Sequence, residues 1–299
     1  MDYFNFDNYC KDNKINFYKN ESMKKHTTFK TGGNADRFVY AENINDIKNL
    51  ISFIKQNNIK SFILGKGSNV IFDDKGFEGV IISTENLKGL SIKENYITAF
   101  SGESLCKTAN FALENSLSGF EFAHGIPGSV GGGVYMNAGA YGECISDILI
   151  STDYMNFDGN IFTLENKKHE FSYRHSFFTN KNYIIISSKF KLNFSDKNKI
   201  KEKMNDLKNR RMSKQPLEFP SAGSTFKRPE GYFAGALIEQ SGLKGYSIGG
   251  AMVSEKHCGF IINYNNASSN DILSLIEYVK KTVYKKFGVT LECEVKYIK

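Results

Sequence analysis

The spacing of apolar residues predicts alternating helices and strands in the first third of the chain. Between Ile44 and Asn57, apolar side chains recur at helical spacing, which predicts an amphipathic helix. The short apolar run SFIL follows and stops at a glycine, as a buried strand does before a loop. GVIIS and YITAFSG have strand length as well, and residues 103–117 again favour a helix. This part of the chain therefore combines α and β structure.

The remaining two thirds continue the same mixture. Strands are predicted at ILISTDYMNF, NIFTLE and NYIIISSKFKLNF, and a charged helix over 197–214 leads to another unit. That unit has predicted strands near 221–227 and 257–263 and helices at about 232–241 and 270–287. Ser269 or Asn270 is the expected N-cap of the last helix, and Gly288 its end. In the terminal VTLECEVKYIK, apolar and polar residues alternate, which predicts a closing strand. The whole pattern predicts an α+β protein with mixed sheets and a domain boundary near residue 200.

Composition narrows the class of protein. A chain of 299 residues has room for roughly two domains, and 40% hydrophobic with 24% charged residues is typical of a globular protein. No window approaches the length of a membrane span, and the N-terminus lacks the pattern of a signal peptide, so we expect a cytoplasmic protein without membrane insertion. The five cysteines include no CxxC pair, which favours reduced thiols and no metal site.

The net charge of +7 favours an anionic ligand. The lysines are interspersed with acidic residues, as in KNKIKEKMNDLKNRR, which is typical of a solvated helix. We therefore expect no nucleic-acid partner, and a diphosphate ligand explains the excess with a few well-placed cations.

One candidate phosphate-binding loop follows the SFIL strand directly. Gly65, Gly67, Ser68 and Asn69 can turn backbone N–H groups inward and add side-chain donors. A Walker loop is absent, and Val70 stands where a Rossmann fingerprint needs its third glycine. From this stretch alone, an ordinary Gly-Ser turn is an equal alternative.

A second stretch, Gly125 to Gly142, is unusually rich in glycine and small side chains. Such a composition costs backbone entropy, so we infer that the backbone comes close to a partner, for which a flat ring and a diphosphate are good candidates. The segment TFKTGG, residues 28–33, is a third candidate. Two or more such loops predict a large dinucleotide in an extended conformation.

These segments together resemble the UDP-N-acetylenolpyruvoylglucosamine reductase family. The similarity covers about residues 25–298 in order, through TTFKTGGNADRFV, LGKGSNVIFDDKGFEGVII, FAHGIPGSVGGGVYMNAGAYGE, FSYRHSFF, FPSAGSTFKRP, LIEQSGLKGYSIGGAMVSEKHCGFIIN and LECEVKYI. The short spacing between the YR and SAGS motifs resembles the subgroup that lacks a tyrosine-bearing insertion. Departures are few: Cys258 stands where a small residue is commoner, and the last residue is Lys299 rather than glycine.

The resemblance implies an α+β fold: a two-part FAD-binding module of the vanillyl-alcohol-oxidase/PCMH type and a smaller α+β substrate-binding domain. The expected boundaries are 1–200 for the FAD-binding domain, with subdomains of about 1–85 and 86–200, then 201–290 for the substrate-binding domain. Residues 291–299 would be a C-terminal strand that returns to the flavin side.

The implied activity is NADPH-dependent, FAD-mediated reduction of UDP-N-acetylglucosamine enolpyruvate to UDP-N-acetylmuramate in peptidoglycan synthesis. Hydride would reach C3 and a proton C2, with FAD bound noncovalently, although some relatives of the module attach it to a histidine, for which His124 is the candidate. The expected partners are the nucleotide-sugar and NADPH, and the expected state is a monomer or weak dimer.

By motif match, three residues are catalytic. Ser224 is the proton donor to C2, Arg174 pairs with the substrate carboxylate, and Glu294 polarises that carboxylate. Without the resemblance, Ser224 would be interpreted as a turn serine, Arg174 as part of a surface ion pair, and Glu294 as a solvent-facing strand residue. Glu292 lies two positions before Glu294 and is the alternative to it.

The remaining candidates bind cofactor or substrate. The cofactor residues are Thr31, Gly32, Gly33, Leu64, Gly65, Lys66, Gly67, Ser68, Asn69, Gly125, Ile126, Pro127, Gly128, Ser129, Gly131, Gly132, Asn137, Ala138 and Gly139. The substrate residues are Lys214, Lys227 and Arg228 for the diphosphate, with Lys256 and His257 at the pocket border. Another FAD-dependent oxidase or dehydrogenase, or a nucleotide-binding regulator without turnover, is the alternative function, and SAGSTFKRP with the three catalytic positions argues against both.

Overall fold

The computed structural model describes residues 3–299, which pack as two compact units. The first holds the chain up to Lys19, then Arg37–Lys66 and Gly79–Asn209, and the second holds Asn20–Asp36, Gly67–Glu78 and Arg210–Lys299. Both units are therefore discontinuous in sequence, whereas the expected boundaries at 85, 200 and 290 cut the chain into consecutive pieces. That three-part division stays a prediction.

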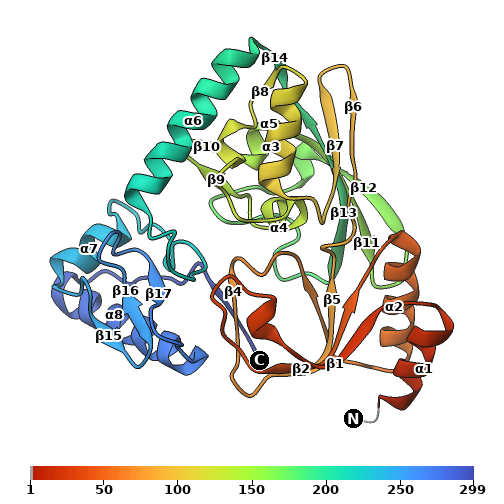
Figure 1. Cartoon of the computed structure of the whole chain (residues 1–299), viewed down its shortest axis with the longest axis horizontal. Helices are drawn as coiled ribbons and strands as arrows, with labels where there is room; N and C mark the ends of the chain where they lie inside the picture. Colours follow the sequence, from red (N-terminus) through yellow and green to blue (C-terminus); the bar gives the residue numbers. More distant parts are fainter. Residues whose placement is uncertain (1–2) are drawn as a thin grey trace. The chain divides into compact units, whose positions relative to one another are not determined.

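Four strands form a sheet in the order β1-β2-β5-β3, which are Phe17–Ser22, Asn34–Tyr40, Phe77–Ser83 and Ser61–Leu64. Helix α1 (Phe4–Asp12) and the predicted helix α2 (Ile44–Gln56) lie beside it (Figure 1). The apolar stripe of α2 packs in one core with α1 and the strands, and Ile47, Leu50 and Ile51 are fully buried there. The side chain of Asn43 caps α2 by accepting a hydrogen bond from the N–H of Asp46 at 3.0 Å.

A five-stranded antiparallel sheet dominates the first unit, in the order β12-β11-β13-β7-β6. Its strands are Ile161–Glu165, Leu149–Asn156, Tyr183–Lys191, Tyr96–Phe100 and Leu90–Lys93, so the predicted strands in these regions are confirmed. Figure 1 shows α3 (Leu105–Glu114), α4 (Val130–Tyr135) and α5 (Ile145–Ile148) together on one side of this sheet. Their core is mainly aliphatic and includes aromatic rings, with the Phe120 ring edge-on to Phe190 at 5.1 Å.

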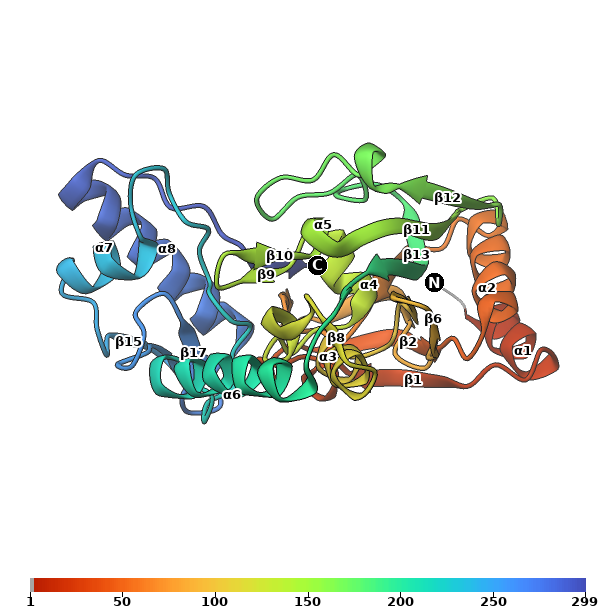
Figure 2. The same cartoon turned by 90° about the horizontal axis from the view of Figure 1, so that it is seen from above.

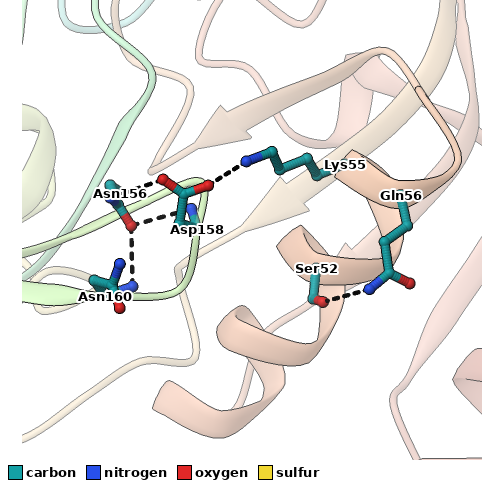
Figure 3. Close-up of polar contacts among 6 residues, drawn as sticks. All are labelled: Ser52, Lys55, Gln56, Asn156, Asp158 and Asn160. Carbon is teal, nitrogen blue, oxygen red and sulfur yellow. Dashed lines mark hydrogen bonds and ion pairs between the residues drawn. The ribbon is translucent and has the colours of Figure 1, made fainter.

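The turn between β11 and β12 is fixed by Asn156 (Figure 3). Its Oδ1 accepts hydrogen bonds from the N–H groups of Asp158, at 3.0 Å, and Asn160, at 2.9 Å. Asp158 is thereby presented to Lys55 of α2, with which it forms an ion pair. Both of these side chains are more than half exposed, so the pair adds little stability.

Short elements complete the first unit. Strand β8 (Leu117–Ser118) pairs with β14 (Asn193–Phe194), and β9 (Gly139–Ala140) pairs with β10 (Glu143–Cys144). The single 3-10 turns η2 (Glu121–Ala123) and η3 (Asn166–Lys168) lie in this unit, and η1 (Met23–Lys25) lies in the second unit. The charged helix α6 spans Lys197–Lys214, as predicted, and buries only Ile200, Met204 and Leu207.

In the second unit, helices α7 (Ala234–Gln240) and α8 (Ser269–Phe287) pack with a three-stranded sheet. Its strands are β15 (Ser247–Ile248), β16 (Ala251–Val253) and β17 (Ile261–Asn263), which lie beside α8 in Figures 1 and 2. Gly288 ends α8 in the left-handed conformation, as predicted, with φ 69°. The N-cap prediction was wrong by one residue: Ser268 is the cap, because its hydroxyl accepts from the N–H of Asp271 at 3.0 Å.

Three strand predictions in this unit were too long. Residues 221–227 form only a single bridge, between Phe226 and Cys293, and 257–263 becomes a strand only at β17. In the terminal segment, only β18 (Lys296–Ile298) is a strand, and it pairs in parallel with β4 (Val70–Phe72). The pairing of 225–227 with 292–294 stops after one bridge, because the next backbone group, the N–H of Thr225, bonds to a different segment. The N–H of Thr225 donates to Gly259 O, and that of Lys227 to Glu292 O.

Across residues 3–299, no helix is both long enough and apolar enough to cross a membrane.

Candidate functional site

The predicted cofactor residues divide between the two units. Leu64–Lys66 and 125–139 belong to the first unit, whereas Thr31–Gly33 and Gly67–Asn69 belong to the second. Among the predicted catalytic residues, Arg174 lies in the first unit, and Ser224 and Glu294 lie in the second.

In the first unit, the two predicted glycine-rich loops lie against each other. A Cβ atom on Gly65 would stand 2.5 Å from Oγ of Ser129, so a side chain here would displace that hydroxyl. The same Ser129 hydroxyl caps α4 by accepting from the N–H of Gly132 at 3.3 Å. Gly128 is tied to α3, because its carbonyl accepts from the N–H of Leu105 at 3.1 Å. The backbones of the two loops therefore form one local arrangement.

Part of the glycine content has a different cause from the one predicted. A Cβ on Gly131 would lie 2.8 Å from Cβ of Ser101, and one on Gly139 would lie 2.7 Å from Cβ of Cys144. At these two positions the protein itself already leaves no room for a side chain, so the glycine does not by itself indicate a ligand, and their contact with the cofactor stays a prediction. Gly132, by contrast, is exposed and meets only the Ser129 hydroxyl.

Asn137 links the glycine-rich stretch to the segment that carries Arg174. Its Nδ2 donates to Ser172 O at 3.2 Å, and its Oδ1 accepts from the N–H of Ser146 at 3.0 Å. Asn137 is buried and has φ 46°, a conformation that asparagine tolerates better than most residues. The side chain is thus engaged inside the protein, and any contact with the cofactor stays a prediction.

Arg174 sits in a tight turn with strained backbone. Its φ is 57°, and across the turn Ser172 and His175 each donate their N–H to the carbonyl of the other. Its Nη2 donates to the carbonyl of Gly139 at 3.4 Å, and the guanidinium lies 5.1 Å from the ring centroid of Tyr173. Left-handed backbone at a non-glycine residue costs about 1–2 kcal/mol and is common at functional sites. The turn thus directs the Arg174 guanidinium toward the end of the glycine-rich stretch.

A buried imidazole anchors the start of the same segment. His169 is fully buried, with Nδ1 3.0 Å from Glu165 O and Nε2 2.9 Å from Oγ1 of Thr152. The carbonyl can only accept, so Nδ1 carries the proton and Nε2 accepts from the threonine hydroxyl. Burial lowers the pKa of His169, which keeps the ring neutral. The His169 carbonyl in turn accepts from the N–H of Phe177 at 2.6 Å, which holds the segment on both sides of Arg174.

In the second unit, the TFKTGG segment lies against the predicted phosphate loop. The N–H of Thr28 donates to Gly67 O at 3.1 Å, and Thr31 is fully buried. The hydroxyls of Thr28 and Thr31 are buried without a hydrogen-bond partner among residues 3–299, as is that of Ser101 in the first unit. A buried unpaired hydroxyl costs about 1–3 kcal/mol, and a bound polar ligand would remove that cost. Within each unit, these hydroxyls therefore fit a phosphate or ribose oxygen of a dinucleotide such as FAD.

Ser224 and Glu294 are held on neighbouring segments of the second unit. The N–H of Glu294 donates to the carbonyl of Thr225 at 2.9 Å, and the adjacent Phe226 and Cys293 form a bridge. Both predicted catalytic side chains are half-buried. Glu292 is 71% exposed and forms an ion pair with Lys227 at 3.1 Å, which supports Glu294 over its alternative.

The predicted substrate cations are mostly exposed and differ in their partners. Lys227 is paired with Glu292, Lys256 is 3.7 Å from the carboxylate of Glu218, and the guanidinium of Arg228 lies 4.0 Å from the Phe233 ring centroid.

His257, also a predicted substrate residue, is half-buried. Burial lowers the pKa of His257, and the positive charge of Lys214 acts in the same direction. Its Nδ1 accepts from the N–H of Gly259 at 3.1 Å, so the proton of the neutral ring is on Nε2. The ring is thus fixed on the turn whose carbonyl, Gly259 O, holds Thr225.

Two residues with a place in these arrangements were not identified from the sequence. Ser101 follows strand β7 in the motif FSGES, and only its packing against Gly131 reveals it. Thr225 was covered by the SAGSTFKRP motif, but its hydrogen bonds become visible only in the fold. Within residues 3–299, no cluster of His, Cys, Asp and Glu could hold a metal ion.

The fold and these loops define a flavoprotein. Residues 35–165 match the family described as FAD binding domain. The fold is also that of Physcomitrella patens BBE-like 1, with a TM-score of 0.50 and 12% identity over 62% of this chain and 44% of that one. The two-part FAD-binding fold expected from the sequence is confirmed.

More specific similarities identify the family. Residues 215–298 match the family described as UDP-N-acetylenolpyruvoylglucosamine reductase, C-terminal domain. The UDP-N-acetylenolpyruvoylglucosamine reductase of Caldanaerobacter subterraneus subsp. tengcongensis is 48% identical over 281 residues, which are 94% of this chain and 93% of that protein. The crystal structure of UDP-N-acetylenolpyruvylglucosamine reductase from Thermus caldophilus has a TM-score of 0.81 and 29% identity, over 95% of this chain and 99% of that one. The chain belongs to the UDP-N-acetylenolpyruvoylglucosamine reductase family.

Proposed function

We propose that this chain reduces UDP-N-acetylglucosamine enolpyruvate to UDP-N-acetylmuramate, with FAD as cofactor and NADPH as electron donor. The observation that carries the proposal is the pairing of Ser224 and Glu294 on adjoining segments, within the 215–298 region that matches the reductase C-terminal domain. When bound, FAD supplies the hydride, taken from NADPH, that is added to C3 of the enolpyruvyl group.

The cofactor would be held by backbone and hydroxyl groups rather than by charged side chains. In the first unit these are Leu64–Lys66 and 125–139, and in the second Thr31–Gly33 and Gly67–Asn69. The unpaired hydroxyls of Thr28, Thr31 and Ser101 supply polar partners. No residue in these arrangements requires a covalent link to the flavin.

Reduction of the enolpyruvyl group needs one hydride at C3 and one proton at C2. Hydride addition moves negative charge onto the attached carboxylate, where the guanidinium of Arg174 can stabilise it without losing a proton. The carboxyl group of Glu294, if protonated, would donate a hydrogen bond to the same carboxylate. The Ser224 hydroxyl then gives its proton to C2, which is basic enough to take it over one hydrogen-bond length, and regains a proton from water.

The substrate nucleotide would be recognised by cations of the second unit. Lys214, Lys227 and Arg228 supply positive charge for the diphosphate, and Lys256 and His257 border the same region. Because the substrate and NADPH are intracellular metabolites, the chain would act in the cytoplasm, as a monomer or weak dimer, in peptidoglycan synthesis.

The role of Ser224 is tested by separating the two half-reactions under anaerobic conditions. Ser224→Ala should leave flavin reduction by NADPH unchanged and slow flavin reoxidation by the enolpyruvate by about 100- to 10,000-fold. Ser241→Ala is the matched control, because Ser241 lies in the same unit and its hydroxyl donates to Leu237 O at 2.8 Å. Equal losses in both half-reactions would refute the proton-donor role.

A further inference from the structure

The residue that follows Ser224 is held by hydrogen bonds to several segments of the second unit. Thr225 is fully buried, and each of its three polar groups makes a hydrogen bond within the second unit. Its N–H donates to Gly259 O at 2.9 Å, its carbonyl accepts from the N–H of Glu294 at 2.9 Å, and its Oγ1 accepts from the N–H of Ile261 at 3.0 Å. One residue thus joins the Ser224 turn to the segments around 260 and 294.

Glu294 is fixed from its other side as well. The Nδ2 of Asn69 donates to Glu294 O at 3.1 Å, and the carbonyl of Asn69 accepts from the N–H of Lys296 at 3.0 Å. The backbone N–H of Glu294 is therefore bonded to Thr225, and its backbone carbonyl to Asn69. Asn69 belongs to the predicted phosphate loop, whereas the Thr225 hydroxyl bonds to Ile261, which is not a predicted cofactor residue.

We propose that the Thr225 hydroxyl is a positioning group for proton transfer. It keeps the Ser224 side chain at a fixed position relative to Glu294. This inference rests on the proposed roles of those two residues. The two backbone bonds of Thr225 are available to any amino acid, but the bond to Ile261 requires a side-chain acceptor. Ile261 is fully buried, so without that acceptor its N–H loses its partner and the turn must shift to find another.

A small shift has a large effect on this step. Transfer from Ser224 to C2 depends on a hydroxyl oxygen within hydrogen-bond reach of carbon, and a displacement of about 1 Å can slow such a reaction about 100-fold. Flavin reduction by NADPH does not use the Ser224 proton. Loss of the Thr225 hydroxyl should therefore affect only one half-reaction.

The experiment compares Thr225→Val, which keeps the shape but not the acceptor, with Thr225→Ser, which keeps the hydroxyl. We expect Thr225→Val to slow flavin reoxidation by the enolpyruvate about 10- to 100-fold, with flavin reduction by NADPH unchanged and Thr225→Ser close to the wild type. Thr282→Val is the matched control in the same unit, because the Thr282 hydroxyl donates only within α8, to Tyr278 O at 2.8 Å. In the Ser224→Ala background, Thr225→Val should cause no further slowing.

The outcomes separate this inference from the proposed function. If Ser224→Ala is slow but Thr225→Val reoxidises as fast as Thr282→Val, the positioning role is refuted and the proposed function stands. If Ser224→Ala reoxidises at the wild-type rate, the proton-donor role fails and the positioning role with it. Should Thr225→Val not fold, Thr225→Ala removes the same acceptor with less bulk, and its rates decide between the same outcomes.

Discussion

Gly67 gives the sharpest test of whether the glycines of the phosphate loop serve the protein or the cofactor. A Cβ at this position would lie 1.9 Å from His26 O and 3.0 Å from Cα of Thr27, and φ is +58°. The left-handed backbone costs alanine about 1–2 kcal/mol, and relief of the clash costs about 1–3 kcal/mol more. The bond from the N–H of Thr28 to Gly67 O, at 3.1 Å, would be weakened in addition. Gly67→Ala should therefore lower the free energy of unfolding by about 3–5 kcal/mol.

The assay is urea unfolding of the FAD-free protein, with Gly242→Ala as control. Gly242 also has a positive φ, of +79°, and lies in the same unit, but nothing stands within 4 Å of a Cβ there. The control should lose only the backbone term, about 1–2 kcal/mol. If the FAD-free Gly67→Ala protein is no less stable than Gly242→Ala, the packing explanation is refuted, and the glycine is there for the ligand.

Four further substitutions test the stability of the fold. Asp7→Asn leaves Arg37 without its bidentate partner, at 2.5 and 2.9 Å, and should cost about 2–4 kcal/mol in urea unfolding. Lys55→Ala, which breaks an exposed pair, should cost less than about 1 kcal/mol, and equal losses would contradict this ranking. Because burial lowers the pKa of His169, the unfolded state takes up its proton first, so stability is complete above pH 6.5 and falls as the pH drops below it. His169→Gln should flatten that fall, and an unchanged pH profile would exclude this ring as its source. Ser268→Ala should lower the stability measured by thermal unfolding by about 1 kcal/mol, and no loss would argue against Ser268 as the cap of α8.

Helices were predictable where the signal is local. The periodicity of Ile47, Leu50 and Ile51 defines α2, and charge alone identifies α6. The long strands were predictable for the same reason, because their apolar runs are bounded by turns. The N-cap of α8 was missed by one position, although the sequence does distinguish the two serines. Ser268 has Asp271 three positions later, which is capping-box spacing, whereas Ser269 has Ile272 there.

The segments around the candidate catalytic residues were not predictable in this way. Residues 221–227 and 289–295 alternate like strands, but their backbone groups bond to several remote segments, and alternation cannot reveal that. The sequence likewise does not show why a given position needs glycine. At Gly131 the reason is the close approach of Ser101, which is distant in sequence. Motif similarity therefore points to Ser224 and Glu294, whereas the part played by Thr225 follows only from its three hydrogen bonds.

The most direct test of the proposed function is the visible spectrum of the purified protein, followed anaerobically. NADPH should bleach the flavin band, and UDP-N-acetylglucosamine enolpyruvate should restore it without oxygen. A band that bleaches but returns only with oxygen would indicate an oxidase instead, and a protein that takes up no FAD would contradict a flavin-dependent reductase altogether.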